Sequence, residues 1–224
     1  MVKKSIEDKY KKLDDREHVL LRSSMYIGST NLHKYNKYVS LDGKMNEQEI
    51  EYIPGFLKLF DEIIMNSVDE SKREGSKLNT IKVDIIDNKI VVWDNGGIPV
   101  VIHKDEKQYV PEMIFSSLKA GSNFDDTEDR SWAGTNGVGS SLVNIFSKEF
   151  NVVTCDGKKL FKQTFTDNMS NRTKPKVTKA SKGYTEISYI PDLKRLNMES
   201  IDDTHRLLIE KRVIDIAACN PKIK

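Results

Sequence analysis

Apolar residues fall on one face of a predicted helix over residues 54–75, where they recur three and four positions apart. Other helices are expected where this spacing returns or where a proline can occupy a first turn, and strands where apolar and polar positions alternate. The expected helices span residues 6–22, 54–75, 111–118, 137–147 and 200–218, and the expected strands span residues 80–86, 89–93, 149–155, 159–166 and 184–190. These elements predict one α+β domain, a two-layer sandwich with helices on one face of a mostly antiparallel sheet.

The stretches between these elements carry their own signals. The first two expected strands pair as a hairpin across residues 87–88. Residues 30–50 are polar with a turn signal at residues 42–43, which indicates either an insertion or a small hairpin. Residues 119–136 are polar and acidic. They predict an irregular lid rather than a calcium loop, because the fixed spacing of a calcium loop is missing.

Composition adds few constraints on function. The chain has 224 residues and 38% hydrophobic content, which is enough for one globular core. Its formal net charge of +2 does not by itself indicate binding to nucleic acid. Basic residues are concentrated in residues 158–182. This segment is interpreted either as a loop that follows DNA phosphates or as the solvated tip of a hairpin. Cys155 and Cys219 lack metal or redox spacing, and no apolar run is long enough to span a membrane. We therefore expect a cytoplasmic protein with no membrane partner.

The polar face of the helix over residues 54–75 carries two carboxylates and a carboxamide. Glu62, Asn66 and Asp69 stand at positions i, i+4 and i+7, within roughly 60° of one another around the helix. A glutamate can polarise water as a general base, and an asparagine oxygen can coordinate Mg²⁺. Asp69 fits a supporting role, such as holding a neighbouring loop. The alternative is a plain solvated face.

A glycine-rich segment precedes the expected helix over residues 137–147. Its glycines permit positive φ angles and close approach of the backbone to a ligand, and the start of the helix adds unpaired N–H groups and a positive dipole end. These features predict a cradle for phosphate, with an ordinary turn as the alternative. The segment consists of Gly134, Thr135, Asn136, Gly137, Val138, Gly139, Ser140 and Ser141.

Two strands end or begin with side chains that suit a purine base. Asp94 ends the second expected strand, where its carboxylate can accept a hydrogen bond from an exocyclic amine and so select adenine. Gly96 and Ile98 follow in a loop that lets a base lie against the backbone. Thr185 opens the last expected strand and offers a hydroxyl group. The alternatives are an ordinary strand-to-loop turn and a β-forming threonine without a ligand.

Motifs along nearly the whole chain point to one family. They read EHVLLRSSMYIGS (17–29), YIPGFLKLFDE (52–62), FDEIIMNSVDE (60–70), DNGGIP (94–99), KAGSNFDD (119–126), GTNGVGSSLVNIFS (134–147) and YTEISYIPD (184–192). In this order and spacing they resemble the ATPase domain of type II DNA topoisomerases. These enzymes are GHKL ATPases, like DNA gyrase, heat-shock chaperones, MutL proteins and sensor histidine kinases. The sequences of these motifs most resemble those of enzymes from large tailed phages and of the eukaryotic type. If a phage encodes the chain, the expected cytoplasm is that of the host cell.

The resemblance implies an ATP site with Mg²⁺. By position, Glu62 matches the general base of the family, and Asn66 matches its Mg²⁺-binding asparagine. Asp94 matches the residue that faces the adenine amine, and Thr185 matches the threonine on the adenine side. Residues 134–141 match the phosphate-binding loop.

Other matches carry expectations about closure and assembly. Ser122 and Asn123 match contacts near the ribose and phosphates, inside the expected ATP lid of residues 119–136. Tyr10 lies in an expected N-terminal strap, residues 1–12, which in the family reaches into the nucleotide pocket of the partner protomer. The resemblance thus implies a homodimer that forms on nucleotide binding and gates DNA passage in the intact enzyme.

The sequence departs from the family pattern at two points. The family has one more residue between the glycines that match Gly96 and Gly97, so altered geometry is expected at the adenine. Its phosphate-sensing lysine lies in a downstream transducer domain, and neither that domain nor the DNA-cleavage domain is expected within these 224 residues. The predicted function is an ATP-binding and ATP-hydrolysing topoisomerase domain. The alternatives are an isolated nucleotide-binding module with negligible hydrolysis and another GHKL protein of the MutL type.

Overall fold

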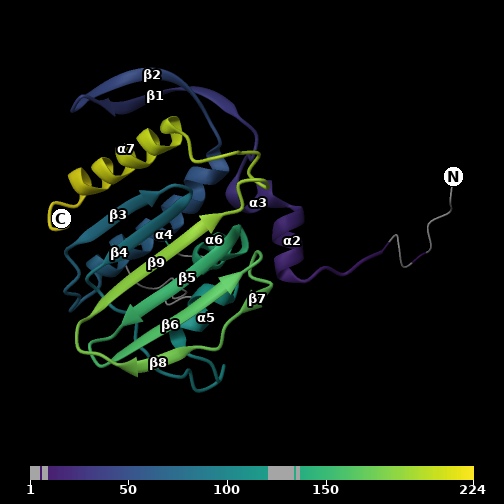
Figure 1. Cartoon of the computed structure of the whole chain (residues 1–224), viewed down its shortest axis with the longest axis vertical. Coiled ribbons are helices and arrows are strands. Elements are labelled where there is room, and N and C mark those ends of the chain that lie inside the picture. Colours follow the sequence, from purple (N-terminus) through teal and green to yellow (C-terminus); the bar gives the residue numbers. More distant parts are fainter. Residues whose placement is uncertain (1–5, 7–9, 121–133, 135–136) are drawn as a thin grey trace.

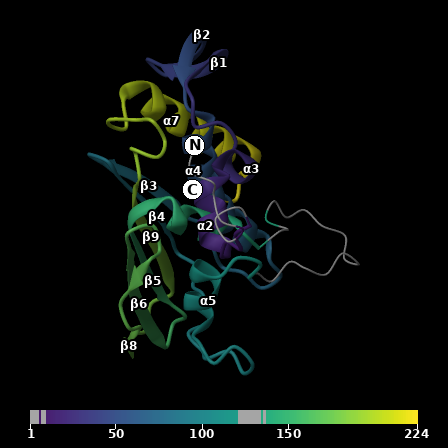
Figure 2. The same ribbon diagram turned by 90° about the vertical axis from the view of Figure 1, so that its right-hand side faces the viewer.

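The computed structural model describes residues 6, 10–120, 134 and 137–224, which form a sheet layer and a helix layer (Figure 1). The helices are α2 (Asp15–Leu21), α3 (Ser23–Ile27), α4 (Pro54–Lys72), α5 (Val110–Ser116), α6 (Gly139–Ile145) and α7 (Asp203–Cys219). The strands are β1 (His33–Leu41), β2 (Lys44–Tyr52), β3 (Ile81–Ile86), β4 (Lys89–Asp94), β5 (Ser147–Cys155), β6 (Lys159–Thr166), β7 (Asn171–Arg172), β8 (Lys176–Lys179) and β9 (Tyr184–Pro191). Seen edge-on, the large sheet forms one layer and α4 and α5 lie to one side of it (Figure 2). The predicted α+β architecture is confirmed.

The large sheet is antiparallel throughout, with the strand order β3-β4-β9-β5-β6-β7 and with β8 also paired to β6. Side chains on a strand point alternately to the two faces of a sheet. In β4 the buried positions are Ile90, Val92 and Asp94. The alternation that builds the core therefore also turns the Asp94 carboxylate toward the helix layer.

Helix α4 lies at the centre of the core. Phe56, Phe60 and Ile63 are at most 2% exposed, as the helical spacing predicts. They share one hydrophobic cluster with Phe150 of β5 and Phe165 of β6. A single core therefore joins the helix layer to the sheet.

Residues 30–50 form the hairpin that was one of the two expected alternatives. Strands β1 and β2 pair from His33 with Tyr52 to Leu41 with Lys44, across a two-residue turn. The turn residues have φ angles of +50° and +72°, which are the left-handed conformations of a tight hairpin turn. The hairpin packs on α7, which lies beside the β3 edge of the sheet (Figure 1).

The prediction of one helix over residues 6–22 is wrong at residues 11–14. Residues 11–14 are not helical, and α2 begins at Asp15. The cause is a capping box. The Asp14 carboxylate accepts a hydrogen bond from the Glu17 backbone N–H at 2.7 Å, and the Glu17 carboxylate accepts one from the Asp14 N–H at 3.3 Å. These bonds satisfy helix-end donors and fix the helix start at this point.

The predicted strands leave out two short strands at the edge of the large sheet. The edge strands β7 and β8 were not predicted, because Asn171–Arg172 is too short for an alternating pattern and Lys176–Lys179 is mostly exposed. No helix in the described part of the chain is both long and apolar enough to cross a membrane.

Replacing Phe150 by alanine tests the core. Its ring lies 5.7 Å from Phe115, 6.4 Å from Phe165 and 6.2 Å from Tyr189, centroid to centroid. The lost packing and the cavity should lower the free energy of unfolding in urea by about 3–5 kcal/mol. The exposed Ile86→Ala is the control and should change it by less than about 0.5 kcal/mol. A loss below about 1 kcal/mol for Phe150→Ala would contradict this core.

Candidate nucleotide-binding site

A cavity of about 250 Å³ opens between α4, the inner face of β4 and β9, and the segment that leads into α6. Its size approaches the range of small-molecule sites. The lining is mostly polar along α4 and both apolar and polar along the sheet. It comprises Lys58, Glu62, Ile63, Asn66, Ser67, Asp69, Glu70, Arg73, Val92, Asp94, Gly97, Ile98, Ile114, Phe115, Ala120, Gly134, Gly137, Val138, Gly139, Ser140, Thr185 and Ile187.

Glu62 lies where α4 approaches the start of α6. A Cβ atom at position 139 would lie 1.8 Å from Glu62 Oε2, so a side chain at this position would displace the carboxylate. The other oxygen, Oε1, is paired with the Lys58 ammonium group one turn earlier on α4. The carboxylate is therefore fixed between a cation and the backbone of Gly139, with its side chain 20% exposed.

One turn further along α4, Asn66 and Asp69 contact the glycine-rich segment. The Asn66 amide donates a hydrogen bond to Ser140 Oγ at 2.9 Å, which leaves the Asn66 oxygen as an acceptor. Asp69 is only 4% exposed, and its carboxylate accepts a hydrogen bond from the Gly134 N–H at 2.8 Å. The alternative of a solvated helix face is therefore wrong for Asp69, whose carboxylate is buried and bound to the neighbouring segment.

Asp94 lies at the other end of the cavity. Its carboxylate accepts hydrogen bonds from Ser67 Oγ at 2.6 Å and from the Gly96 N–H at 2.9 Å. Burial raises the pKa of the Asp94 carboxyl above its usual value, although the bonds from Ser67 and Gly96 oppose the shift. Ser67 thus connects α4 directly to the end of β4.

Thr185 contacts a second threonine that the sequence did not single out. The hydroxyl oxygens of Thr185 and Thr154 are 2.9 Å apart. Thr154 also accepts a hydrogen bond from the Ile98 N–H at 3.0 Å. A Cβ atom at Gly97 would lie 2.2 Å from the Cys155 carbonyl oxygen, so the shortened loop lies directly on β5 and requires glycine there.

The remaining predicted site residues are placed less uniformly. Gly137 and Val138 line the cavity and Gly96 does not. Ser141 is buried, and its hydroxyl donates to the Val138 carbonyl at 2.9 Å instead of facing the cavity. Tyr10 is 71% exposed and lies apart from the cavity. Four predicted positions lie outside the described residues, together with most of the expected lid: Ser122, Asn123, Thr135 and Asn136.

Sequence reasoning missed two cations at the site. Lys58 stands four residues before Glu62, a spacing that could have revealed it. Arg73 ends α4, and its guanidinium lies 2.8 Å from the Glu70 carboxylate at the rim of the cavity. Burial raises the pKa of Glu70, and Arg73 opposes this shift. Thr154 carried no signal, because its role follows from strand pairing.

The residues suit a shared metal ion better than a metal site made of protein alone. Within the described ranges, no group of three or more His, Cys, Asp or Glu side chains is arranged to hold a metal. Mg²⁺ is commonly held by one or two protein oxygens together with substrate phosphates. The free acceptor oxygen of Asn66 fits that type of site.

The two-layer sandwich, with a cavity between α4 and a glycine-rich segment, defines a nucleotide-binding fold of the GHKL class. Comparison with known sequences specifies the family. DNA topoisomerase 2 of Arabidopsis thaliana is 42% identical over 223 residues, covering 96% of this chain and 15% of that protein. The probable DNA topoisomerase 2 of Dictyostelium discoideum is 42% identical over 228 residues, covering 99% and 15%. No protein-family model matches the chain.

Solved structures agree with this result. The ATPase region of Saccharomyces cerevisiae topoisomerase II superposes with a TM-score of 0.89 at 36% identity, covering 93% of this chain and 57% of that one. The ATPase and transducer domains of DNA topoisomerase II from Balamuthia mandrillaris give 0.94 at 40% identity, covering 98% and 59%. The chain belongs to the type II DNA topoisomerase family and corresponds to its ATPase region. It spans about 15% of the length of the curated relatives named above.

The raised pKa of Asp94 predicts a pH-dependent cost to stability. Between the unfolded value, 3.8, and the higher folded value, the folded protein binds more protons, so its free energy of unfolding falls as pH rises through this window. Asp94→Asn cannot ionise, yet it can still accept from Gly96 and donate to Ser67. The stability of Asp94→Asn relative to wild type should therefore increase from about pH 4 upward and then level off. Urea unfolding at a series of pH values measures this, and parallel curves would contradict it.

Proposed function

We propose that this chain is the ATP-binding and ATP-hydrolysing domain of a type II DNA topoisomerase, whose nucleotide-driven dimerisation gates DNA strand passage. The observation that carries the proposal is the placement of two kinds of group at the two ends of one cavity. Glu62 and Asn66 lie with the glycine-rich segment at one end, and Asp94 lies at the other. Membership of the topoisomerase family supports the same function.

At the end with Asp94, the groups suit an adenine base. The Asp94 carboxylate accepts hydrogen bonds from Ser67, from the Gly96 N–H and from the Thr185 backbone, and its two oxygens together offer about four lone pairs, so it can still accept from an exocyclic amine. Thr154 donates to the Tyr184 carbonyl at 3.3 Å, so Thr185 donates to Thr154 and keeps its own lone pairs as acceptors. Apolar lining residues provide contact for the faces of the base: Val92, Ile98 and Ile187.

At the other end, backbone N–H groups suit the phosphates. The first turn of α6 is preceded by Val138, which has no side-chain acceptor to cap it. The N–H groups of Gly139 and Ser140 are therefore available to phosphate oxygens. Asn66 would hold Mg²⁺ together with the phosphates, and the ion would neutralise phosphate charge.

Glu62 is the proposed general base. It would take one proton from water as the new bond between oxygen and the γ-phosphorus forms and the bond to the ADP oxygen breaks. Lys58 holds one carboxylate oxygen and Gly139 leaves room for the other, so the carboxylate has one fixed orientation. The backbone N–H groups would stabilise charge on the transferring phosphoryl group.

Glu62→Ala should retain nucleotide binding but lose turnover. Removing a general base typically lowers the rate by about 10²–10⁴-fold. Calorimetry with a non-hydrolysable ATP analogue would measure binding, and phosphate release would measure turnover. Glu49→Ala, which removes a 60%-exposed surface carboxylate from the β1–β2 hairpin, is the matched control and should change neither. Undiminished turnover in Glu62→Ala would remove Glu62 from this role.

A second candidate function is an isolated nucleotide-binding module with negligible hydrolysis. Wild-type protein that binds the analogue without measurable phosphate release would support this function over the first.

Dimerisation is expected to depend on Tyr10, whose exposed side chain suits contact with a partner protomer. Sedimentation velocity with Mg²⁺ and the non-hydrolysable analogue should convert monomer to dimer. Tyr10→Ala should lower the dimer fraction while leaving the nucleotide affinity of the monomer unchanged. Nucleotide binding with no dimer at any protein concentration would contradict the proposed gate.

A further inference from the structure

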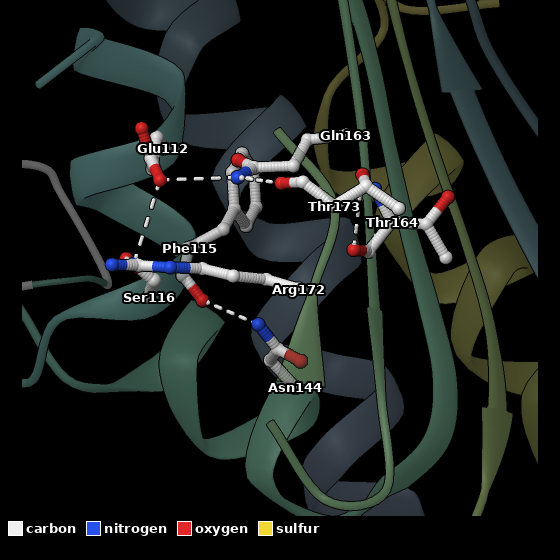
Figure 3. A network of polar contacts seen from close by, with 8 residues as sticks. All are labelled: Glu112, Phe115, Ser116, Asn144, Gln163, Thr164, Arg172 and Thr173. Atoms are coloured by element: carbon white, nitrogen blue, oxygen red, sulfur yellow. Dashed lines mark hydrogen bonds and ion pairs between the residues drawn. The ribbon is translucent and has the colours of Figure 1, made fainter. Parts of the chain in front are cut away.

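A buried cluster of polar side chains lies outside the groups that the proposed mechanism uses (Figure 3). Glu112 of α5 is 9% exposed. Its Oε1 atom accepts a hydrogen bond from Gln163 Nε2 of β6 at 3.0 Å and pairs with Arg172 Nη1 of β7 at 3.4 Å. Gln163 Nε2 also donates to the Thr173 carbonyl at 3.0 Å. The carboxylate of a helix is thereby attached to the edge of the sheet.

The next turn of α5 is held by two further contacts (Figure 3). Asn144 of α6 donates from Nδ2 to the Phe115 carbonyl at 2.8 Å. Arg172 Nη1 lies 3.5 Å from Ser116 Oγ. A helix of seven residues has few internal hydrogen bonds, so contacts of this kind determine where it sits.

This helix forms part of the wall of the nucleotide cavity. Ile114 and Phe115 line the cavity, and Ala120 lines it just beyond the helix. Glu112 is two residues before Ile114, contacts Gln163 of β6 and Arg172 of β7 (Figure 3), and is absent from the described lining. Its contacts therefore fix the position of the wall without touching the space for a ligand.

Stability alone does not account for this cluster. Asn144 Oδ1 and Gln163 Oε1 are buried, and neither has a hydrogen-bond partner within the described ranges. A buried polar group without a partner costs about 1–3 kcal/mol, and apolar groups of similar shape can replace a buried polar pair with little or no loss. The cluster specifies the position of α5 more clearly than it stabilises the fold.

We propose that Glu112 is a positioning residue for the nucleotide site: through Gln163 and Arg172 it ties the α5 wall to the sheet edge and keeps Ile114 and Phe115 in binding position. The proposal rests on the proposed nucleotide-binding function. A small displacement of the last turn of α5 would change the shape of the cavity wall. Such a change weakens binding although no residue that lines the cavity has been replaced.

The test compares the affinity of Glu112 variants for a non-hydrolysable ATP analogue with Mg²⁺. Glu112→Ala should raise the dissociation constant about tenfold, a factor that corresponds to about 1.4 kcal/mol. Glu112→Gln should restore most of the affinity, because its amide oxygen still accepts from Gln163 and Arg172.

Asp192→Ala is the matched control. Asp192 is 2% exposed, accepts from Asn168 Nδ2 at 3.0 Å, and pairs with Lys148 at 3.2 Å and Arg195 at 3.3 Å. It is thus a buried carboxylate with an amide and cationic partners, and none of these residues lines the cavity. We expect Asp192→Ala to lower the unfolding midpoint as Glu112→Ala does while leaving the affinity within about twofold.

Hydrogen exchange provides a readout independent of the nucleotide. Amides of Val110–Ser116 should exchange faster in Glu112→Ala than in wild type or Asp192→Ala, measured without ligand. Unchanged α5 exchange, equal affinity losses in Glu112→Ala and Asp192→Ala, or no rescue by Glu112→Gln would each overturn the role of Glu112 and leave the proposed function standing. Wild-type protein that binds no nucleotide would overturn both.

Discussion

Helix α4 buries polar side chains as well as apolar ones, and the arrangement of the site depends on how those polar groups are satisfied. Ser67 is 6% exposed and Asp69 is 4% exposed. Groups buried to this degree are destabilising unless they form hydrogen bonds. Ser67 finds its partner in Asp94 at the end of β4, and Asp69 finds one in the Gly134 N–H. The hydrogen bonds of these two buried side chains therefore attach α4 both to the sheet and to the glycine-rich segment.

The charges around the cavity bear on how the proposed triphosphate would be held there. Four of the described lining residues are acidic and two are basic. The acidic residues are Glu62, Asp69, Glu70 and Asp94, and the basic residues are Lys58 and Arg73. Lys58 and Arg73 are already paired with Glu62 and Glu70. A polyanion bound there would gain little from side-chain charge, so backbone N–H groups and a cation such as the proposed Mg²⁺ would have to offset its repulsion.

The sequence predicts elements well where one local rule decides them. The spacing of Phe56, Phe60 and Ile63 gives the buried face of α4, and the turn signal at residues 42–43 falls at the turn of the β1–β2 hairpin, one of the two expected alternatives. Local rules also account for the error at residues 11–14, since Asp14 and Glu17 form a capping box that can be read from sequence. Residues that depend on strand pairing could not be found this way. Thr154 meets Thr185 only because β5 lies beside β9, and Glu112 meets Gln163 only because α5 lies on β6.

A similar limit applies to the glycines. Their pattern predicts a phosphate cradle at residues 134–141 and a base-binding loop after Asp94, and the structure gives one glycine of each a further reason to be glycine. Gly139 is required by the Glu62 carboxylate and Gly97 by the Cys155 carbonyl, both at distances that no Cβ atom could tolerate. Neither contact is visible in sequence, because each joins segments more than fifty residues apart. Ser141, which lies in the same motif, uses its hydroxyl inside α6 instead.

The two ends of the cavity are kept at a fixed separation by one rigid element. Glu62 and Asn66 contact the α6 end, and Ser67 contacts Asp94. Ser67 lies five positions after Glu62 on the helix, which corresponds to about 7.5 Å along the axis. An insertion of one residue between them would rotate the two contacts by about 100° relative to each other, so they could not both form. The distance between the Asp94 end and the α6 end of the cavity is therefore set by the geometry of α4.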